Sequence, residues 1–205
     1  IPSDPSSAAF PIIAALIIPG SKIKLDGIMI NPSRIGLINT LKEMGGKISI
    51  SNKKIICGEE TASIEVEYSK LTGVKVPANR APSMIDEYPI LSIAASFAKT
   101  PSLFRGLKEL RVKESDRLNL IKHNLDQCGI FCSINNDDLF IDPSKKNNPK
   151  NNKIVTEKDH RIAMAFAIMG TKLGFDLKIK DSDYINTSFP NFMKKLNMVG
   201  GQLSE

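Results

Sequence analysis

The chain has 205 residues, of which 41% are hydrophobic, so it can bury a core as one domain or as a pair of small ones. Its 28 basic and 22 acidic residues give a formal net charge of +6, which favours an anionic partner without distinguishing nucleic acid, membrane and small phosphorylated molecules. Three cysteines without a CxxC pair and only two histidines make a Cys/His zinc site hard to build, and we expect reduced, mostly buried thiols in a cytosol-like compartment.

The longest apolar run lies near the start of the chain, at residues 8–18. It is too short to cross a bilayer and contains Pro11, so a transmembrane segment is not expected. The chain opens on Ile1 rather than Met and has no basic region before an apolar core. No signal peptide is assigned, and we expect a fragment of a longer protein.

The first predicted unit begins with an apolar helix over residues 4–17, followed by a strand over 21–30. A second helix is predicted over 32–46, with Gly45 as a left-handed C-terminal cap. Residues 47–57 then have the pattern of hairpin strands. Because the first helix is apolar nearly all round, it should be buried on most sides, whereas the second has a narrower stripe and should lie nearer the surface.

The same order of elements recurs in a second unit. A helix is predicted over 82–98, a strand over 102–112, a helix over 115–129 that ends at Gly129, and hairpin strands over 130–142. The apolar stripe of the second helix has helical spacing and consists of Leu118, Ile121, Leu125 and Cys128.

The third unit is shorter. Residues 143–153 lack periodicity and are rich in Asn, Lys and Pro, which predicts a solvated loop before this unit. A helix over 158–173, a strand over 175–185 and a helix over 189–201 with Gly200 near its end complete the pattern. The sequence therefore predicts an α/β fold, a single lobe in which pseudo-repeated units, the last incomplete, enclose buried helices with sheets.

Ionised side chains concentrate where the second helix of the second unit begins. Five of the seven residues from Arg111 to Arg117 are ionised. Glu114 and Asp116 would complement the helix dipole in a solvated first turn, whose exposed ion pairs contribute only about 0–1 kcal/mol each. Lys113 and Arg117 are cations at the unfavourable end of the dipole, which indicates that an anion joins them. We expect this stretch to form one wall of a binding pocket.

The apolar helices of the second and third units also begin with ionised residues. Asp86 suits either a plain helix cap or a functional carboxylate, and the spacing does not decide between them. Asp159 suits an N-cap, while Arg161 on a buried helix needs a paired anion such as a carboxylate or phosphate. His160 favours structural hydrogen bonding over proton transfer. The three helix N-termini could face one shared site.

These residues resemble a known family. The stretches MIDEYPIL, ELRVKESDRL, DHRIAM and SFP, in this order, are similar to the C-terminal lobe of the 5-enolpyruvylshikimate-3-phosphate synthase family. DPSSAAF with the following NPSR resembles the start of that lobe, and the likeness runs essentially the whole length. It is closest to the bacterial subclass that tolerates glyphosate.

The resemblance implies transfer of the enolpyruvyl group of phosphoenolpyruvate to the 5-hydroxyl of shikimate 3-phosphate, with release of phosphate, in aromatic amino acid biosynthesis. It implies an inside-out α/β barrel of βαβαββ units in each of two lobes. Residues 1–205 would form the C-terminal lobe, and without the N-terminal lobe they should be inactive. We expect no metal or organic cofactor, no nucleic-acid or membrane partner, inhibition by glyphosate, and a cytoplasmic monomer.

The resemblance also implies roles for the charged residues. Asp86 would bind substrate and take the proton of the attacking hydroxyl, and Glu114 would transfer a proton to and from the enolpyruvyl carbon. Lys113 would contact shikimate 3-phosphate. Arg117 and Arg161 would bind phosphoenolpyruvate.

Two other interpretations stay open. The net charge and the lysine-rich segment 145–153 fit a basic nucleic-acid-binding module, although the chain has no Trp and few aromatic residues to stack on bases. A non-catalytic remnant of the same fold differs only in what lies upstream.

Overall fold

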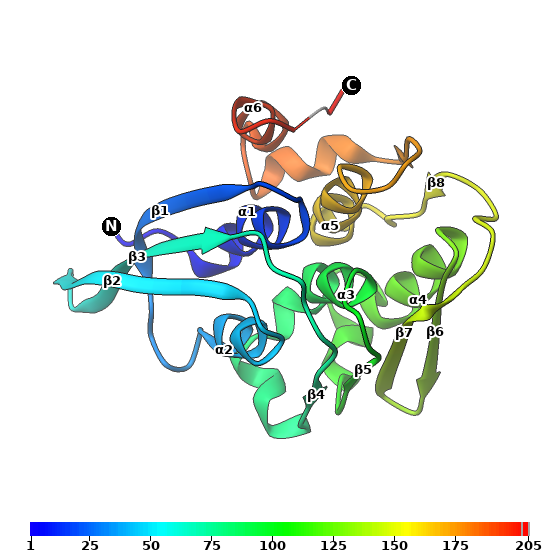
Figure 1. The fold of residues 1–205 in the computed structure, drawn as a ribbon, viewed down its shortest axis with the longest axis horizontal. Helices are drawn as coiled ribbons and strands as arrows, with labels where there is room; N and C mark the ends of the chain where they lie inside the picture. Colours follow the sequence, from blue (N-terminus) through cyan, green and yellow to red (C-terminus); the bar gives the residue numbers. More distant parts are fainter. Residues whose placement is uncertain (202, 205) are drawn as a thin grey trace.

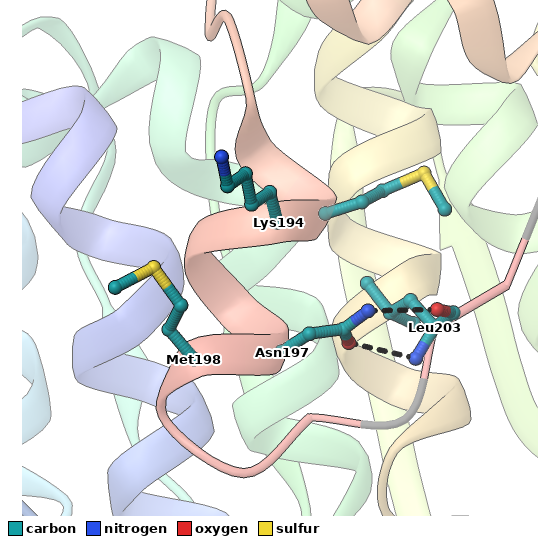
Figure 2. A pocket seen from close by; sticks show the side chains of 5 residues that line it. Lys194, Asn197, Met198 and Leu203 are labelled. Carbon is teal, nitrogen blue, oxygen red and sulfur yellow. Dashed lines mark hydrogen bonds between the residues drawn. The ribbon is translucent and has the colours of Figure 1, made fainter.

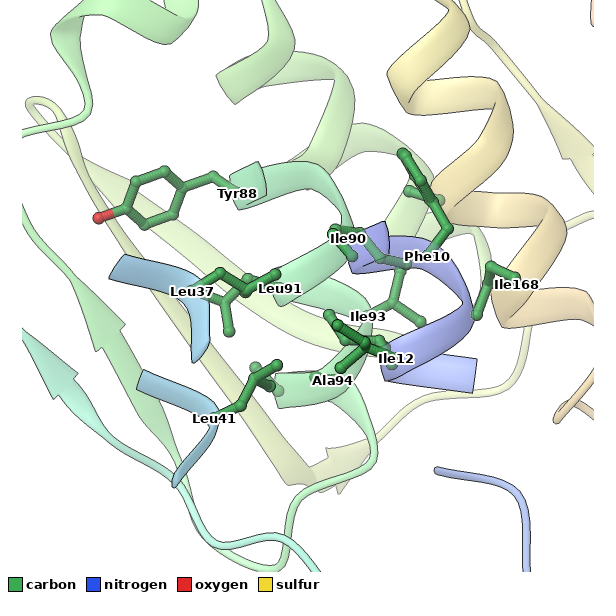
Figure 3. Close-up of a cluster of buried hydrophobic side chains, with 14 of the residues drawn as sticks. Phe10, Ile12, Leu37, Leu41, Tyr88, Ile90, Leu91, Ile93, Ala94 and Ile168 are labelled. Atoms are coloured by element: carbon green, nitrogen blue, oxygen red, sulfur yellow. The ribbon is translucent and has the colours of Figure 1, made fainter. Parts of the chain in front are cut away.

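Three apolar helices pack against one another in the interior of the protein (Figure 1). The computed structural model describes residues 1–201, 203 and 204, without the side chain of Lys146. The central helices are α1 (Pro5–Ile17), α3 (Tyr88–Ser96) and α5 (His160–Gly170). Every residue of α3 is buried, as its all-round apolar sequence predicts. Side chains of α1, α2, α3 and α5 interdigitate in the core, as Figure 3 shows.

The first unit places an antiparallel sheet against α1. Strands β1 (Lys22–Met29), β2 (Lys47–Ile56) and β3 (Glu59–Glu67) lie in the order β1-β3-β2, and α2 (Gly36–Glu43) connects β1 to β2. The core side of β3 carries Ala62, Ile64 and Val66, which are all buried and alternate as one face of a strand must. The predicted strand and hairpin of this unit are confirmed.

The second unit has a four-stranded sheet in the order β4-β5-β7-β6. Its strands are β4 (Lys75–Val76), β5 (Ser102–Phe104), β6 (Ile130–Asn135) and β7 (Asp138–Lys146). Helix α4 (Arg117–Gln127) packs on β6. The predicted apolar stripe of this helix is confirmed, because all of its members, Leu118, Ile121, Leu125 and Cys128, are buried.

The third unit consists of the parallel pair β8 (Lys153–Ile154) and β9 (Lys178–Ile179), with α6 (Phe192–Met198) after it. In the first two units a hairpin follows the second helix, and its second strand pairs antiparallel with the first strand of the unit. Within residues 1–201, 203 and 204 no strand follows α6, so β9 has no antiparallel neighbour there. The prediction of an incomplete last unit is confirmed.

Short 3-10 helices replace parts of three predicted elements. The strand predicted over 102–112 ends at Phe104, because Gly106 has φ +71° and η3 (Lys108–Val112) follows. The strand predicted over 175–185 gives way to η4 (Ser182–Thr187) after Asp181, which is also left-handed at φ +54°.

The helix predicted over 82–98 also begins later than expected. Its first residues lie in η1 (Ala78–Ser83) and η2 (Ile85–Glu87), because Met84 between them has φ −159° and interrupts the helix. Only from Tyr88 onward does the chain form the α-helix.

The loop predicted over 143–153 was too long at both ends. Strand β7 continues to Lys146, because β6 shifts register and pairs Ile130 with that residue. The carboxylate of Asp142 accepts hydrogen bonds from the backbone N–H and the hydroxyl of Ser144, which holds this extension in place. Only residues 147–152 lack regular structure.

Left-handed glycines end the second helix of each unit, as predicted, at Gly45 (φ +86°), Gly129 (φ +80°) and Gly200 (φ +99°). The position of Gly129 is also crowded, since a Cβ there would lie 2.3 Å from the carbonyl oxygen of Asn147. Any other residue would therefore be strained both by its backbone angle and by this contact.

The prediction of mostly buried thiols is confirmed for Cys128 and Cys132, whereas Cys57 is exposed. Burial raises the pKa of Cys128 to about 11 and that of Cys132 to about 12, so both are protonated at neutral pH. In the part of the chain that the structure describes, no helix is long and apolar enough to cross a membrane.

Replacing a core residue of α3 tests this packing. Ile93→Ala should lower the free energy of unfolding by about 2–5 kcal/mol, because it removes methyl groups from a fully buried site and leaves a cavity. Ile55→Ala is the matched control, since that side chain is 74% exposed and its loss should change stability by less than about 0.5 kcal/mol. Urea denaturation of both variants measures the difference, and equal losses would contradict the buried position of α3.

Candidate active site

The guanidinium group of Arg117 lies at the centre of a charged cluster. Arg117 is the first residue of α4, and its side chain is fully buried. Its Nε donates to Asp159 Oδ2 at 2.8 Å and its Nη1 donates to Asp86 Oδ1 at 2.9 Å, while Nη2 contacts Glu114. The N-termini of α3, α4 and α5 therefore meet at one site, as the sequence predicted.

Asp159 joins two of these N-termini. Its carboxylate caps α5 by accepting hydrogen bonds from the backbone N–H groups of Arg161 (2.9 Å) and Ile162 (3.4 Å). It also accepts a hydrogen bond from the Ser115 hydroxyl at 2.9 Å, besides the one from Arg117. Burial alone would raise the pKa of Asp159, but the hydrogen bonds and charge of Arg117 hold it below its usual range. The predicted N-cap is confirmed.

The partnership of Asp159 with Arg117 was missed, since the two residues are 42 positions apart. The sequence signal that could have revealed this pairing is Asp159 itself, an N-cap acid before a largely apolar helix. Such an acid has no water around it and needs a cation as well as the helix N–H groups.

Asp86 lies in the 3-10 turn η2, just before α3. It makes no capping hydrogen bond to that helix, so the interpretation of Asp86 as a plain N-cap was wrong, although Asp86 does lie in the first turn of η2. Its Oδ1 instead lies 2.9 Å from Arg117 Nη1 and 3.4 Å from Lys113 Nζ. Burial acts to raise the pKa of Asp86, but Arg161, Lys113 and Arg117 together lower it. Asp86 is therefore an ionised carboxylate at neutral pH.

Arg161 also faces this cluster, from the first turn of α5. Its side chain is 18% exposed, and its Nη1 lies 3.8 Å from Oε1 of Glu87. The predicted buried arginine with an anionic partner is thus found, although the partner belongs to the protein. His160 precedes Arg161 in the chain, and its pKa is lowered by burial and by the charge of Arg161. No hydrogen bond of this imidazole occurs among the described residues, so the predicted structural bonding is not seen.

Arg111 is not part of the cluster, contrary to the expectation that the whole charged stretch forms one wall. Its Nε donates to Asp137 at 2.9 Å and its Nη2 donates to the carbonyl oxygen of Asn136 at 2.6 Å. Both acceptors lie in the turn between β6 and β7. Arg111 therefore fixes η3 to that turn, and the site begins at Lys113.

Other features of the described chain do not add to the site. A shallow hollow on α6 is lined by Met193, Lys194, Asn197, Met198 and Leu203 (Figure 2), and no residue of the charged cluster is among them. No group of three His, Cys, Asp or Glu side chains among residues 1–201, 203 and 204 is arranged to hold a metal ion.

Buried helices enclosed by sheets, with ionised groups meeting at the helix N-termini, define a lobe of the enolpyruvyl transferase fold. A solved structure of EPSP synthase from Acinetobacter baumannii superposes with a TM-score of 0.92 at 36% identity, covering 100% of this chain and 48% of that one. The enolpyruvyl transferase NikO from Streptomyces tendae has the same fold, with a TM-score of 0.75 at 14% identity, over 96% of this chain and 43% of that one.

The sequence profile for EPSP synthase (3-phosphoshikimate 1-carboxyvinyltransferase) matches residues 1–196, and the chain belongs to this family. It is 46% identical to the 3-phosphoshikimate 1-carboxyvinyltransferase of Methylobacterium sp. (strain 4-46) over 205 residues, which are 100% of this chain and 46% of that protein. The corresponding enzyme of Caulobacter vibrioides (strain NA1000 / CB15N) is also 46% identical, with the same coverage. The chain thus spans about half the length of the curated relatives it matches.

The Arg117–Asp159 pair should stabilise the lobe in a pH-dependent way. Asp159→Asn leaves a buried guanidinium short of its main counter-charge and should cost about 3–5 kcal/mol of unfolding free energy at pH 7. The folded-state pKa of Asp159 is lowered, so its contribution is present above the unfolded pKa of roughly 4 and is lost as pH falls through the folded value.

Urea denaturation from pH 7 down to about pH 3 measures this effect. The difference between parent and Asp159→Asn should shrink as the pH falls. Asp176→Asn, at an exposed position, is the control and should follow the parent. A difference that stays constant with pH would show that the carboxylate charge of Asp159 does not stabilise the fold.

Proposed function

We propose that this chain is one lobe of an enzyme that transfers the enolpyruvyl group of phosphoenolpyruvate to the 5-hydroxyl of shikimate 3-phosphate and releases phosphate. The observation that carries the proposal is the cluster in which Lys113 and Arg117 contact the carboxylate of Asp86, while the charge of Arg161 also lowers the pKa of that carboxyl group. Two polyanionic substrates repel each other, and cations together with helix N-termini offset that repulsion. Membership of the EPSP synthase family supports the same reaction.

The three cations differ in how free they are to bind an anion. Lys113 is 30% exposed and suits the phosphate or hydroxyl groups of shikimate 3-phosphate. Arg161 makes no hydrogen bond through its guanidinium among the described residues, so its donors can take the carboxylate or phosphate of phosphoenolpyruvate. Each of the three nitrogens of Arg117 contacts a protein carboxylate. Of these partners Glu114 is the most exposed, at 52%, and it must turn away before Arg117 can bind a substrate.

Two carboxylates are suited to move protons. Asp86 is ionised at neutral pH and accepts the proton of the attacking hydroxyl. Glu114 leaves Arg117 when substrate arrives and takes up a proton from solvent. It then gives that proton to the enolpyruvyl carbon and takes one back as phosphate leaves. Both lie beside Arg117, which holds them within reach of one bound substrate pair.

Asp86→Asn in the complete protein tests the proton-accepting role. The change should lower kcat by about 10²–10⁴-fold, because the amide cannot take up the proton, and should change both KM values by less than about tenfold. Steady-state phosphate release at saturating and limiting substrate separates the two effects. Asp183→Asn, at an exposed position, should behave as the parent, and a parental kcat for Asp86→Asn would remove this residue from the reaction.

We propose that a second lobe completes both the site and the third unit. In residues 1–201, 203 and 204, β9 pairs only with β8, whereas the equivalent strands β1 and β5 each pair with a hairpin, which supports this proposal. Residues 1–205 alone should release no phosphate from the two substrates, whereas the complete protein should turn over. Turnover by the isolated lobe would contradict the two-lobe proposal, and an inactive complete protein would favour the non-catalytic remnant.

The remaining features of the proposed enzyme are those of the family as a whole. We propose a cytoplasmic monomer that needs no metal or organic cofactor and that glyphosate inhibits at the phosphoenolpyruvate site. Tolerance of glyphosate, as in the bacterial subclass that the motifs resemble, stays a prediction, and an inhibition titration against phosphoenolpyruvate measures it.

A further inference from the structure

Glu87 is a buried carboxylate that has no role in the proposed reaction. It follows Asp86 in the turn before α3, and its side chain is 7% exposed. Its Oε1 has no hydrogen-bond partner among the residues described. A buried carboxylate oxygen without such a partner costs folding free energy, so a neutral residue would make the protein more stable at this position. The fold alone therefore does not explain Glu87.

The contact of Glu87 with Arg161 is of an unusual kind. Their closest atoms, Oε1 and Nη1, are 3.8 Å apart, which is beyond the 2.7–3.2 Å range of an N–H···O hydrogen bond. Glu87 thus supplies a compensating charge for Arg161 but does not occupy its N–H donors. Arg117 is the opposite case, because each of its three nitrogens contacts a carboxylate.

Two residues from the first unit, Ser6 and Arg34, act on Glu87. The buried hydroxyl of Ser6, at the start of α1, accepts a hydrogen bond from Arg34 Nη2 at 2.9 Å. Burial raises the pKa of Glu87, while Ser6, Arg161 and Arg34 act against that rise. Glu87 therefore lies close to Arg161, at the N-terminus of α5, and to Ser6, at the N-terminus of α1.

We infer that Glu87 is a positioning residue that holds the guanidinium of Arg161 in place with its hydrogen-bond donors open to an incoming anion. This inference rests on the proposed function, in which Arg161 binds phosphoenolpyruvate. Glu87 touches Arg161 rather than the reacting atoms. Without the charge of Glu87, Arg161 is left with Asp86, whose pKa it already lowers, and turns its donors toward that carboxylate.

Glu87→Gln in the complete protein is the first test, because it keeps the shape of the side chain and removes its charge. The KM for phosphoenolpyruvate should rise about tenfold, since a charge-assisted contact with Arg161 is weakened. The KM for shikimate 3-phosphate should stay within about threefold, and the Tm should be equal to that of the parent or higher. Glu60→Gln, at an exposed position on β3, is the matched control.

A double-mutant cycle shows whether Glu87 acts through Arg161. In an Arg161→Ala background, Glu87→Gln should cause no further loss of phosphoenolpyruvate affinity, measured by calorimetry with shikimate 3-phosphate bound. Additive losses would overturn the inference. So would a lower Tm of Glu87→Gln together with equal changes in both KM values, because that pattern marks a purely structural residue.

A third measurement does not depend on the reaction. Phenylglyoxal modifies arginines, and Glu87→Gln should slow its reaction with Arg161 by about threefold or more as the guanidinium forms hydrogen bonds with Asp86. Arg105, which is 61% exposed, serves as the internal reference. Unchanged reactivity of Arg161 would overturn the positioning role whatever the enzyme catalyses. An inactive parent with the expected change in reactivity would instead overturn only the proposed function.

Discussion

The buried ion pair of Arg117 and Asp159 is the interaction on which the rest of the site depends. Removing two charges from water costs several kcal/mol per ion, and their attraction compensates only when further hydrogen bonds satisfy both groups. Here Ser115, Asp86 and two backbone N–H groups of α5 provide those bonds. Because the pair links the first residue of α4 to the N-cap of α5, the two helices cannot shift independently without breaking it.

The balance of charge around this pair explains which group can respond to a substrate. Arg117 faces three carboxylates, of which Asp159 is fully buried and Asp86 is also held by Lys113. Glu114 is half exposed, and among the described residues its carboxylate contacts only Arg117, so it can turn into solvent when another anion takes its place. An anion that approaches Arg117 therefore displaces Glu114 first. The carboxylate released in this way is the one to which the proposal assigns proton transfer to carbon.

Much of this arrangement was readable in the sequence, and the reasons for success and failure are physical. Apolar periodicity and terminal glycines located the buried helices and the hairpins, since each depends on local spacing. Arg117 stood out because a cation at a helix N-terminus is unfavourable without an anion, and Arg161 because an arginine on a buried helix needs a paired anion. The turns after Phe104 and Asp181 were missed because they depend on left-handed residues within strand-like sequence. The pairing of Arg117 with Asp159 and the distant anchor of Arg111 depend on tertiary contacts that no local pattern records.

The pseudo-repeat gives a reason why charges from distant parts of the chain converge. Each unit begins with a buried helix, and the three helices pack side by side, so their N-termini lie near one another without any special arrangement. The units then differ in what they contribute there. The second and third units provide the carboxylates and cations of the cluster. The first unit provides Ser6 and Arg34, which are hydrogen-bonded to each other. Glu87 connects the N-terminus of α1 to Arg161, so the first unit, which contributes no carboxylate to the cluster, can still influence the charge of the shared site.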